Sequence, residues 1–93
     1  MKYHTSEFIS CRMERVFEQR LEQLNPLANP IHAEATRILA AASAKASEHE
    51  TESAYVDAFE LAIESAIEEA CLKGAAAVPL IDFLVMIRDD GQE

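Results

Sequence analysis

The sequence predicts an all-α protein, a small bundle of three to four helices, and three observations support this prediction. Apolar residues recur every three or four positions along most of the chain, which is the spacing of one buried helix face. The two glycines and three prolines lie where such helices should begin or end. A chain of 93 residues has the size of one small domain, so we expect residues 1–93 to form a single helical domain.

The first helix is expected from about Ser6 to Leu24. Its apolar face consists of Ile9, Met13, Val16, Phe17, Leu21 and Leu24. Two Asn-Pro steps follow within residues 25–30, and the residue before a proline is forced out of the helical region. The first helix must therefore end near Leu24, and Pro30 is suited to the first turn of the next helix.

The second helix should have a narrow apolar face that is rich in alanine. This face consists of Ile31, Ala35, Ile38, Leu39, Ala42 and Ala46. The next seven residues, 47–53, read SEHETES and contain no apolar side chain. We expect a turn there, because Thr51 and Ser53 can cap a following helix. One long helix is the alternative, because no glycine or proline interrupts residues 31–73.

Two further elements are expected after this turn. A third helix should end at Lys73-Gly74, and its apolar face consists of Tyr55, Val56, Phe59, Ala62, Ile63, Ala66 and Ala70. Residues 78–91, VPLIDFLVMIRDDG, are the most apolar part of the chain. We expect a helix there, with a strand as the alternative, because periodicity does not separate the two in a short apolar run.

The predicted core is thin, since many of the apolar residues are alanines and aromatic residues make up only 6% of the chain. Apolar side chains of the last element lie on two faces, and one small helical hairpin covers only one of them. We therefore expect a homodimer, because a twofold partner would cover the second face. The predicted dimer interface consists of Leu80, Ile81, Phe83, Leu84 and Ile87.

The charge of the protein is strongly negative and unevenly distributed. The net charge is -9, and residues 30–93 carry all of it. Such a surface repels phosphate backbones and anionic lipids, so we expect no direct contact with nucleic acid and none with a membrane. Four carboxylates lie within about 80° of one another on the third helix, around one leucine. The set is Asp57, Glu60, Leu61, Glu64 and Glu68.

We expect this acidic surface to bind a protein partner, and a basic partner would complement its charge. The alternative is a solvated surface that only keeps the protein in solution. No catalytic, cofactor or metal motif is present, so we expect no enzyme, no cofactor and no bound metal. His49 and its neighbouring glutamates supply too few ligands for a tight metal site. Arg12 and Arg15 could lower the pKa of Cys11, but no histidine is placed beside this thiol as a base, and we interpret it as an apolar filler.

The combined prediction is a cytoplasmic regulator that acts by direct protein contact, as an inhibitor, an anti-activator or a chaperone. The first residues lack the apolar stretch of a signal peptide, and no run approaches 18 apolar residues. Cys11 and Cys71 are expected to be free thiols in that compartment. The alternative function is a structural or assembly subunit of a larger complex, and a third is mimicry of nucleic acid by the acidic helix.

Overall fold

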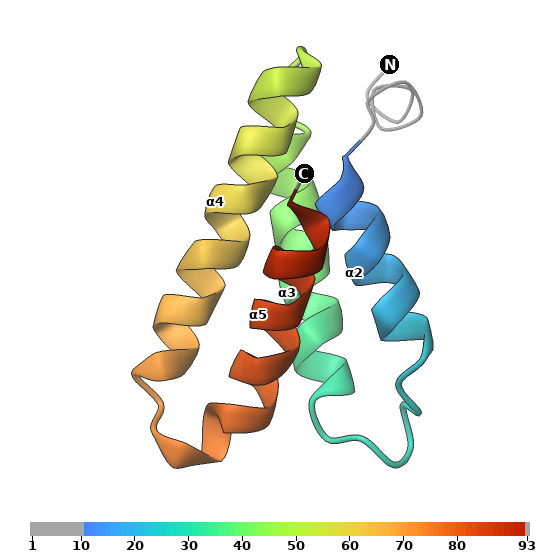
Figure 1. Ribbon diagram of the computed structural model, residues 1–93, viewed down its shortest axis with the longest axis vertical. Helices are drawn as coiled ribbons and strands as arrows, with labels where there is room; N and C mark the ends of the chain where they lie inside the picture. The colour runs from blue at the N-terminus through green and yellow to red at the C-terminus, as the bar shows by residue number, and fades with distance from the viewer. Residues whose placement is uncertain (1–10, 93) are drawn as a thin grey trace.

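The computed structural model describes residues 11–92, which form four α-helices and one short 3-10 helix (Figure 1). The elements in chain order are α2 Arg12–Glu22, α3 His32–Ala46, α4 Glu52–Cys71, η1 Ala75–Ala77 and α5 Val78–Gly91. No strand occurs within residues 11–92. The prediction of an all-α fold is therefore confirmed, and the strand alternative for residues 78–91 is wrong.

Successive helices run in opposite directions and form an up-down-up-down bundle (Figure 1). Each helix contacts the next one along the chain, and α5 returns to pack against α2, which closes the bundle. The α2–α3 and α4–α5 connections lie at one end of the bundle, on opposite sides of it, and the α3–α4 turn lies at the other end. None of the helices within residues 11–92 is both long enough and apolar enough to cross a membrane.

The turns of the α2–α3 connection are stabilised by its two asparagine side chains. Helix α2 ends at Glu22, two residues before the predicted end, and the predicted start near Ser6 lies outside the described residues. The side-chain oxygen of Asn25 accepts a hydrogen bond from the backbone N–H of Leu27, and that of Asn29 accepts one from Ile31. Asparagine side chains that bond two residues ahead stabilise turns, so this loop turns twice before α3 begins.

The two other connections also have clear local causes. The turn at residues 47–51 is confirmed, and the single long helix is wrong. Thr51 is the N-cap of α4, and its hydroxyl accepts a hydrogen bond from the backbone N–H of Ala54. The α4–α5 connection passes through Gly74, whose φ of 86° lies in the left-handed region that favours glycine.

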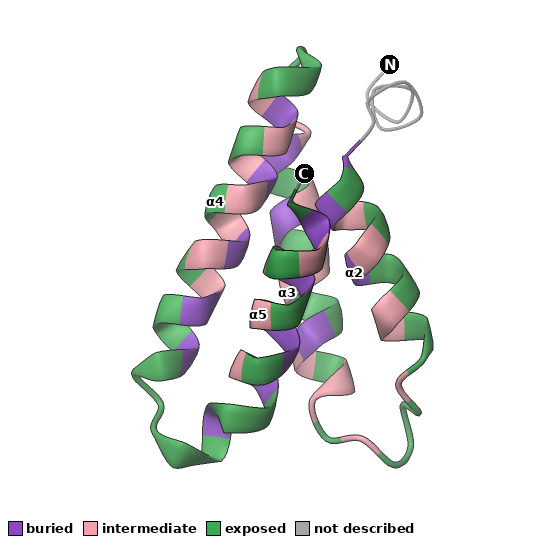
Figure 2. Cartoon of the chain, viewed as in Figure 1, coloured by how far each residue is buried: buried purple, intermediate pink, exposed green. Residues whose placement is uncertain are grey.

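The core lies between all four helices, as the inward-facing buried residues in Figure 2 show. Its largest fully buried side chains are Tyr55, Phe17, Phe59, Met13, Ile63, Leu84 and Ile87. The rings of Phe17 and Phe83 meet edge to face with their centroids 5.7 Å apart, which joins α2 to α5. Three alanines of α3 are buried, and a small side chain at these positions lets α3 approach its neighbours closely.

Most of the residues predicted to form a dimer interface belong to this core. Leu80, Phe83, Leu84 and Ile87 are at most 6% exposed in the single chain, and Ile81 is half-buried. Helix α5 packs against α2 and also against α4, so the face that carries these four residues is covered within one chain. Ile81 and Val85, on the other face, are partly buried against the core. The face with the four buried residues therefore needs no second copy to cover it. Dimerisation itself stays a prediction.

Candidate functional site

A groove lies between α3 and α4, with a volume of about 570 Å³. It has an apolar floor, which consists of Ile38, Ala41, Ala42, Ala58, Ala62, Ala66, Ala70 and Leu80. Four of these alanines recur at every fourth position of α4, so they share one side of that helix. Because an alanine side chain is a single methyl group, this row leaves space between α3 and α4 that longer side chains would fill.

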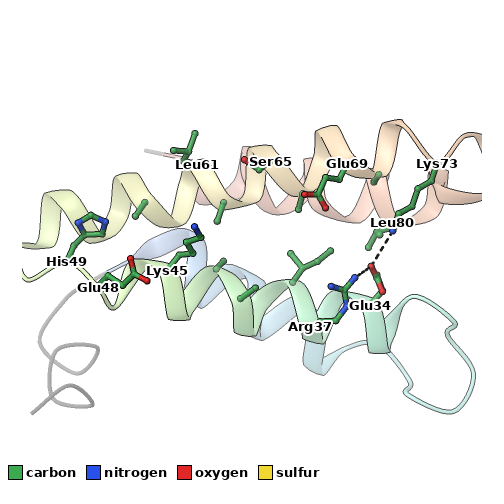
Figure 3. Close-up of a pocket in the computed structure, with 17 residues that line it drawn as sticks. Glu34, Arg37, Lys45, Glu48, His49, Leu61, Ser65, Glu69, Lys73 and Leu80 are labelled. Carbon is green, nitrogen blue, oxygen red and sulfur yellow. Dashed lines mark hydrogen bonds and ion pairs between the residues drawn. The ribbon is translucent and has the colours of Figure 1, made fainter.

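The rims of the groove carry charges of both signs (Figure 3). Its carboxylates are Glu34, Glu48 and Glu69, and its cations are Arg37, Lys45 and Lys73. The rim charges therefore balance, in contrast to the net charge of -9 of the whole chain. Ser65 and Leu61 complete the α4 side, and His49 lies beside Glu48 at one end.

One end of the groove is bridged by ion pairs. The carboxylate of Glu34 pairs with Arg37 on α3, and it lies 3.6 Å from the ammonium nitrogen of Lys73 beyond the end of α4. These side chains are one-third to two-thirds exposed, so water screens the pairs and their contribution to stability is small. Of the two pairs, only that between Glu34 and Lys73 crosses from one rim to the other (Figure 3).

The five residues that the sequence predicts as a partner-binding surface do not all lie on the same surface in the structure. Leu61 is 67% exposed and lines the groove. The four carboxylates, Asp57, Glu60, Glu64 and Glu68, do not line it. Glu64 faces the other side of α4, since its carboxylate lies 3.5 Å from the guanidinium of Arg88 on α5. We call these four carboxylates the acidic ridge, and Leu61 lies between the ridge and the groove.

Asp57 and Glu60 also line a second hollow, which lies near the start of α2 and the end of α5. Its other lining residues are Arg12, Met13, Glu52, Ser53, Val56 and Gly91. Asp57 is exposed and Glu60 is half-buried.

A polar cluster that sequence reasoning missed joins three helices inside the bundle. The carboxylate of Glu14 on α2 accepts hydrogen bonds from the hydroxyl of Ser43 on α3, at 2.6 Å, and from that of Tyr55 on α4, at 2.7 Å. Burial and the nearby Glu14 carboxylate both raise the pKa of Tyr55. The sequence signal was Tyr55 itself, because a tyrosine within an apolar helix face needs a partner for its hydroxyl.

Cys11 lies beside this cluster and is only 3% exposed. Burial raises the pKa of its thiol, and the negative charge of Glu14 adds to the rise. Arg12 and Arg15 could have lowered this pKa, but burial of the thiol raises it. A buried thiol with a raised pKa is a poor nucleophile, and its role is packing. Within residues 11–92, no three histidine, cysteine or acidic side chains are grouped to hold a metal ion.

The described residues thus offer one apolar groove with a charge-balanced rim, and an acidic ridge next to it. Comparisons with protein-family models, curated proteins and solved structures found no match to this chain.

Proposed function

We propose that this protein is a cytoplasmic regulator that binds one helix of a partner protein in the groove between α3 and α4. The observation that carries the proposal is the groove: an open hollow of about 570 Å³ with an apolar floor. Contiguous exposed apolar surface of this kind marks interaction sites. The regulator would act by occupying its target, as an inhibitor, an anti-activator or a chaperone does.

The dimensions of the groove suit a helix. It extends along α3 from Glu34 to Lys45, which corresponds to about 17 Å at the helical rise per residue, or about three turns of a partner helix. Its alanine floor lets a second backbone approach closely, and a helix lying there would insert apolar side chains spaced three and four residues apart. A small-molecule site needs polar groups that converge on the ligand, whereas the floor here is apolar and the polar groups lie on the rims.

The acidic ridge indicates the charge of the partner. A helix seated in the groove would contact Leu61, and its flank on that side would lie near the exposed carboxylates of Asp57 and Glu68. Lysine or arginine on that flank would complement the ridge. Long-range attraction of this kind raises the association rate more than it strengthens the final complex.

Site-specific photo-crosslinking in the source cells tests the proposal. A photoreactive amino acid would replace Ser65, an exposed residue on the groove rim. The matched control would carry it at Gln19, which is exposed on α2 and does not line the groove. We expect position 65 to cross-link to one protein, through a peptide with helical periodicity and basic residues, and position 19 to give no such product.

Other results would change the proposal in specific ways. Equal cross-linking from both positions, or none from position 65, would contradict binding in the groove. Cross-links from both positions to several chains of one stable complex would instead support the alternative of an assembly subunit, because such a subunit is surrounded by its neighbours.

A further inference from the structure

Lys45 differs from the other lysine and arginine side chains within residues 11–92, because it alone has no ion pair or hydrogen bond there. Six of these seven side chains have a polar partner: Arg12, Arg15, Arg20, Arg37, Lys73 and Arg88. The chain has 17 acidic residues against 8 lysines and arginines, so carboxylates are in excess. Lys45 is therefore available to an acidic group of a partner.

This unpaired side chain lines the groove. Lys45 lies in the last turn of α3, and its side chain extends from α3 into the space between α3 and α4 (Figure 3). The groove residues one turn earlier on α3 are Ala41 and Ala42, which carry no charge. Glu48 also lines the groove but forms no ion pair with Lys45, and a lysine that precedes a glutamate is the weaker order for a pair along a helix.

The two sides of the groove present different charges to a helix that lies between them. Within residues 34–45 of α3, the one carboxylate is Glu34, and two cations already pair with it. Lys45 is therefore the charge that this side leaves for a ligand. On the α4 side, Glu69 lines the groove and the acidic ridge lies next to it. A bound helix would meet a cation on its α3 flank and carboxylates on its α4 flank.

We propose that Lys45 determines which helix the groove accepts, by pairing with an aspartate or glutamate on the flank of the partner helix that faces α3. The partner is then an amphipathic helix with three distinct sides: an apolar face on the floor, a basic flank toward the acidic ridge and an acidic flank toward Lys45. This inference rests on the proposed binding of a helix in the groove. It adds the residue that discriminates between one amphipathic helix and another.

The two flank charges also determine the direction in which the helix lies. Once its apolar face rests on the floor, turning a helix end for end exchanges its left and right flanks. Only one direction places the acidic flank at Lys45 and the basic flank at the acidic ridge. The reverse direction places lysine or arginine opposite Lys45 and carboxylates opposite the ridge, so both contacts become repulsive. Lys45 and the ridge together therefore reject the reversed helix.

A double-mutant cycle with two synthetic helices tests the role of Lys45. Both peptides have about 14 residues, slightly more than three turns, with leucines on the apolar face and lysines on one flank. The other flank carries glutamates in the first peptide and glutamines in the second. Fluorescence anisotropy gives the affinity of each peptide for the wild type and for Lys45→Gln. Lys45→Gln should weaken the glutamate peptide about fivefold more than the glutamine peptide, the contribution of one well-placed exposed ion pair.

Two further variants separate the failure of this inference from the failure of the groove. Ala62→Phe fills the floor and should weaken both peptides at least about tenfold. Ala40→Glu makes the same charge change as Lys45→Gln on the exposed outer side of α3, and it should affect both peptides equally.

The possible outcomes are distinct. If Lys45→Gln affects both peptides equally while Ala62→Phe still prevents binding, the role of Lys45 is wrong and the groove remains a helix site. If Ala62→Phe has no effect, or if neither peptide binds the wild type, the proposed function and the role of Lys45 are both overturned. Lys45 is exposed, so Lys45→Gln should keep the helix content of the wild type by circular dichroism.

Cys71 allows the direction of the bound helix to be measured. It is an exposed free thiol near the end of the groove that Lys73 lines, whereas Cys11 is buried, so a spin label should attach selectively to Cys71. A second label is placed at either end of the glutamate peptide, and one end should lie nearer to Cys71. In a peptide whose lysine and glutamate flanks are exchanged, the other end should be the nearer one. The same end nearest in both peptides would overturn the control of direction by these charges.

Discussion

Gly91, the last residue of α5, packs directly on the backbone of Met13 in the first turn of α2. A Cβ atom at position 91 would lie 2.6 Å from the Cα of Met13, closer than real side chains approach. The preceding residue, Asp90, adds polar contacts, since its carboxylate lies 2.5 Å from the guanidinium of Arg20 and its backbone carbonyl accepts a hydrogen bond from Arg12. The end of α5 and the start of α2 are therefore in close contact.

Gly91→Ala should destabilise the fold because the added methyl group must displace the backbone of α2. We expect the free energy of unfolding in urea to fall by about 1–3 kcal/mol, the usual cost of overpacking. Gln92→Ala is the control, since Gln92 is exposed one residue further along, and it should change stability by less than about 0.5 kcal/mol. Equal effects of the two substitutions would show that the helices separate at this point in solution.

Tyr55→Phe should lower stability by about 1 kcal/mol at neutral pH, because Glu14 loses one of its hydrogen-bond donors. The pKa of Tyr55 is raised in the fold, so its neutral hydroxyl contributes fully below the unfolded pKa of about 10 and the contribution is lost as pH rises above it. Urea unfolding between pH 7 and pH 11 should show the difference between wild type and Tyr55→Phe shrinking above pH 10. A constant difference would mean that the hydroxyl is not buried.

Filling the groove should prevent partner binding. Ala62→Phe places an aromatic ring on the floor, and once a partner is identified we expect its affinity to fall at least about tenfold, the loss of one central contact. Ala40→Phe makes the same substitution on the exposed outer side of α3, outside the groove, and should leave the affinity within about twofold. Calorimetric titration measures both. A larger loss for Ala40→Phe would place the partner on the outer face of α3.

Neutralising carboxylates of the acidic ridge should lower the rate at which the partner associates. The double variant Asp57→Asn, Glu68→Gln should slow association by about tenfold at low salt and flatten its salt dependence, with little change in dissociation. Glu64 is left unchanged because it pairs with Arg88. The control is Glu18→Gln with Glu22→Gln, which removes the same charge from the exposed side of α2. Stopped-flow rates that fall equally in both double variants would show that only net charge matters.

The sequence was sufficient to predict the helices and the turns between them, because both depend on local signals. Thr51 caps α4 through its side-chain hydroxyl, and Gly74 adopts a left-handed backbone conformation. Both residues have these roles at the positions that the sequence predicts. The apolar spacing also identified the buried faces correctly, including Phe17 and Phe59.

How the helices pack against one another could not be predicted in the same way. The apolar surface of α5 was assigned to a second copy because a single sequence does not show that α2 and α4 pack on both of its sides. The groove was missed for a similar reason, since its floor combines alanines of α3 and α4 that each look like ordinary core residues. Leu61 was identified because an exposed leucine among carboxylates is visible from helical spacing alone.

The order of helices around the bundle has a consequence for how the protein folds. Almost every helix packs on the one that follows it in the chain, so most contacts have a low sequence separation and need little loop closure. The contact of α5 with α2 is the main exception, because it joins the two ends of the described chain, and α2 also makes a smaller contact with α4. We therefore expect the α3–α4 hairpin to belong to the folding nucleus and the docking of α5 on α2 to come late. Substitutions at Gly91 should then accelerate unfolding and leave the folding rate nearly unchanged.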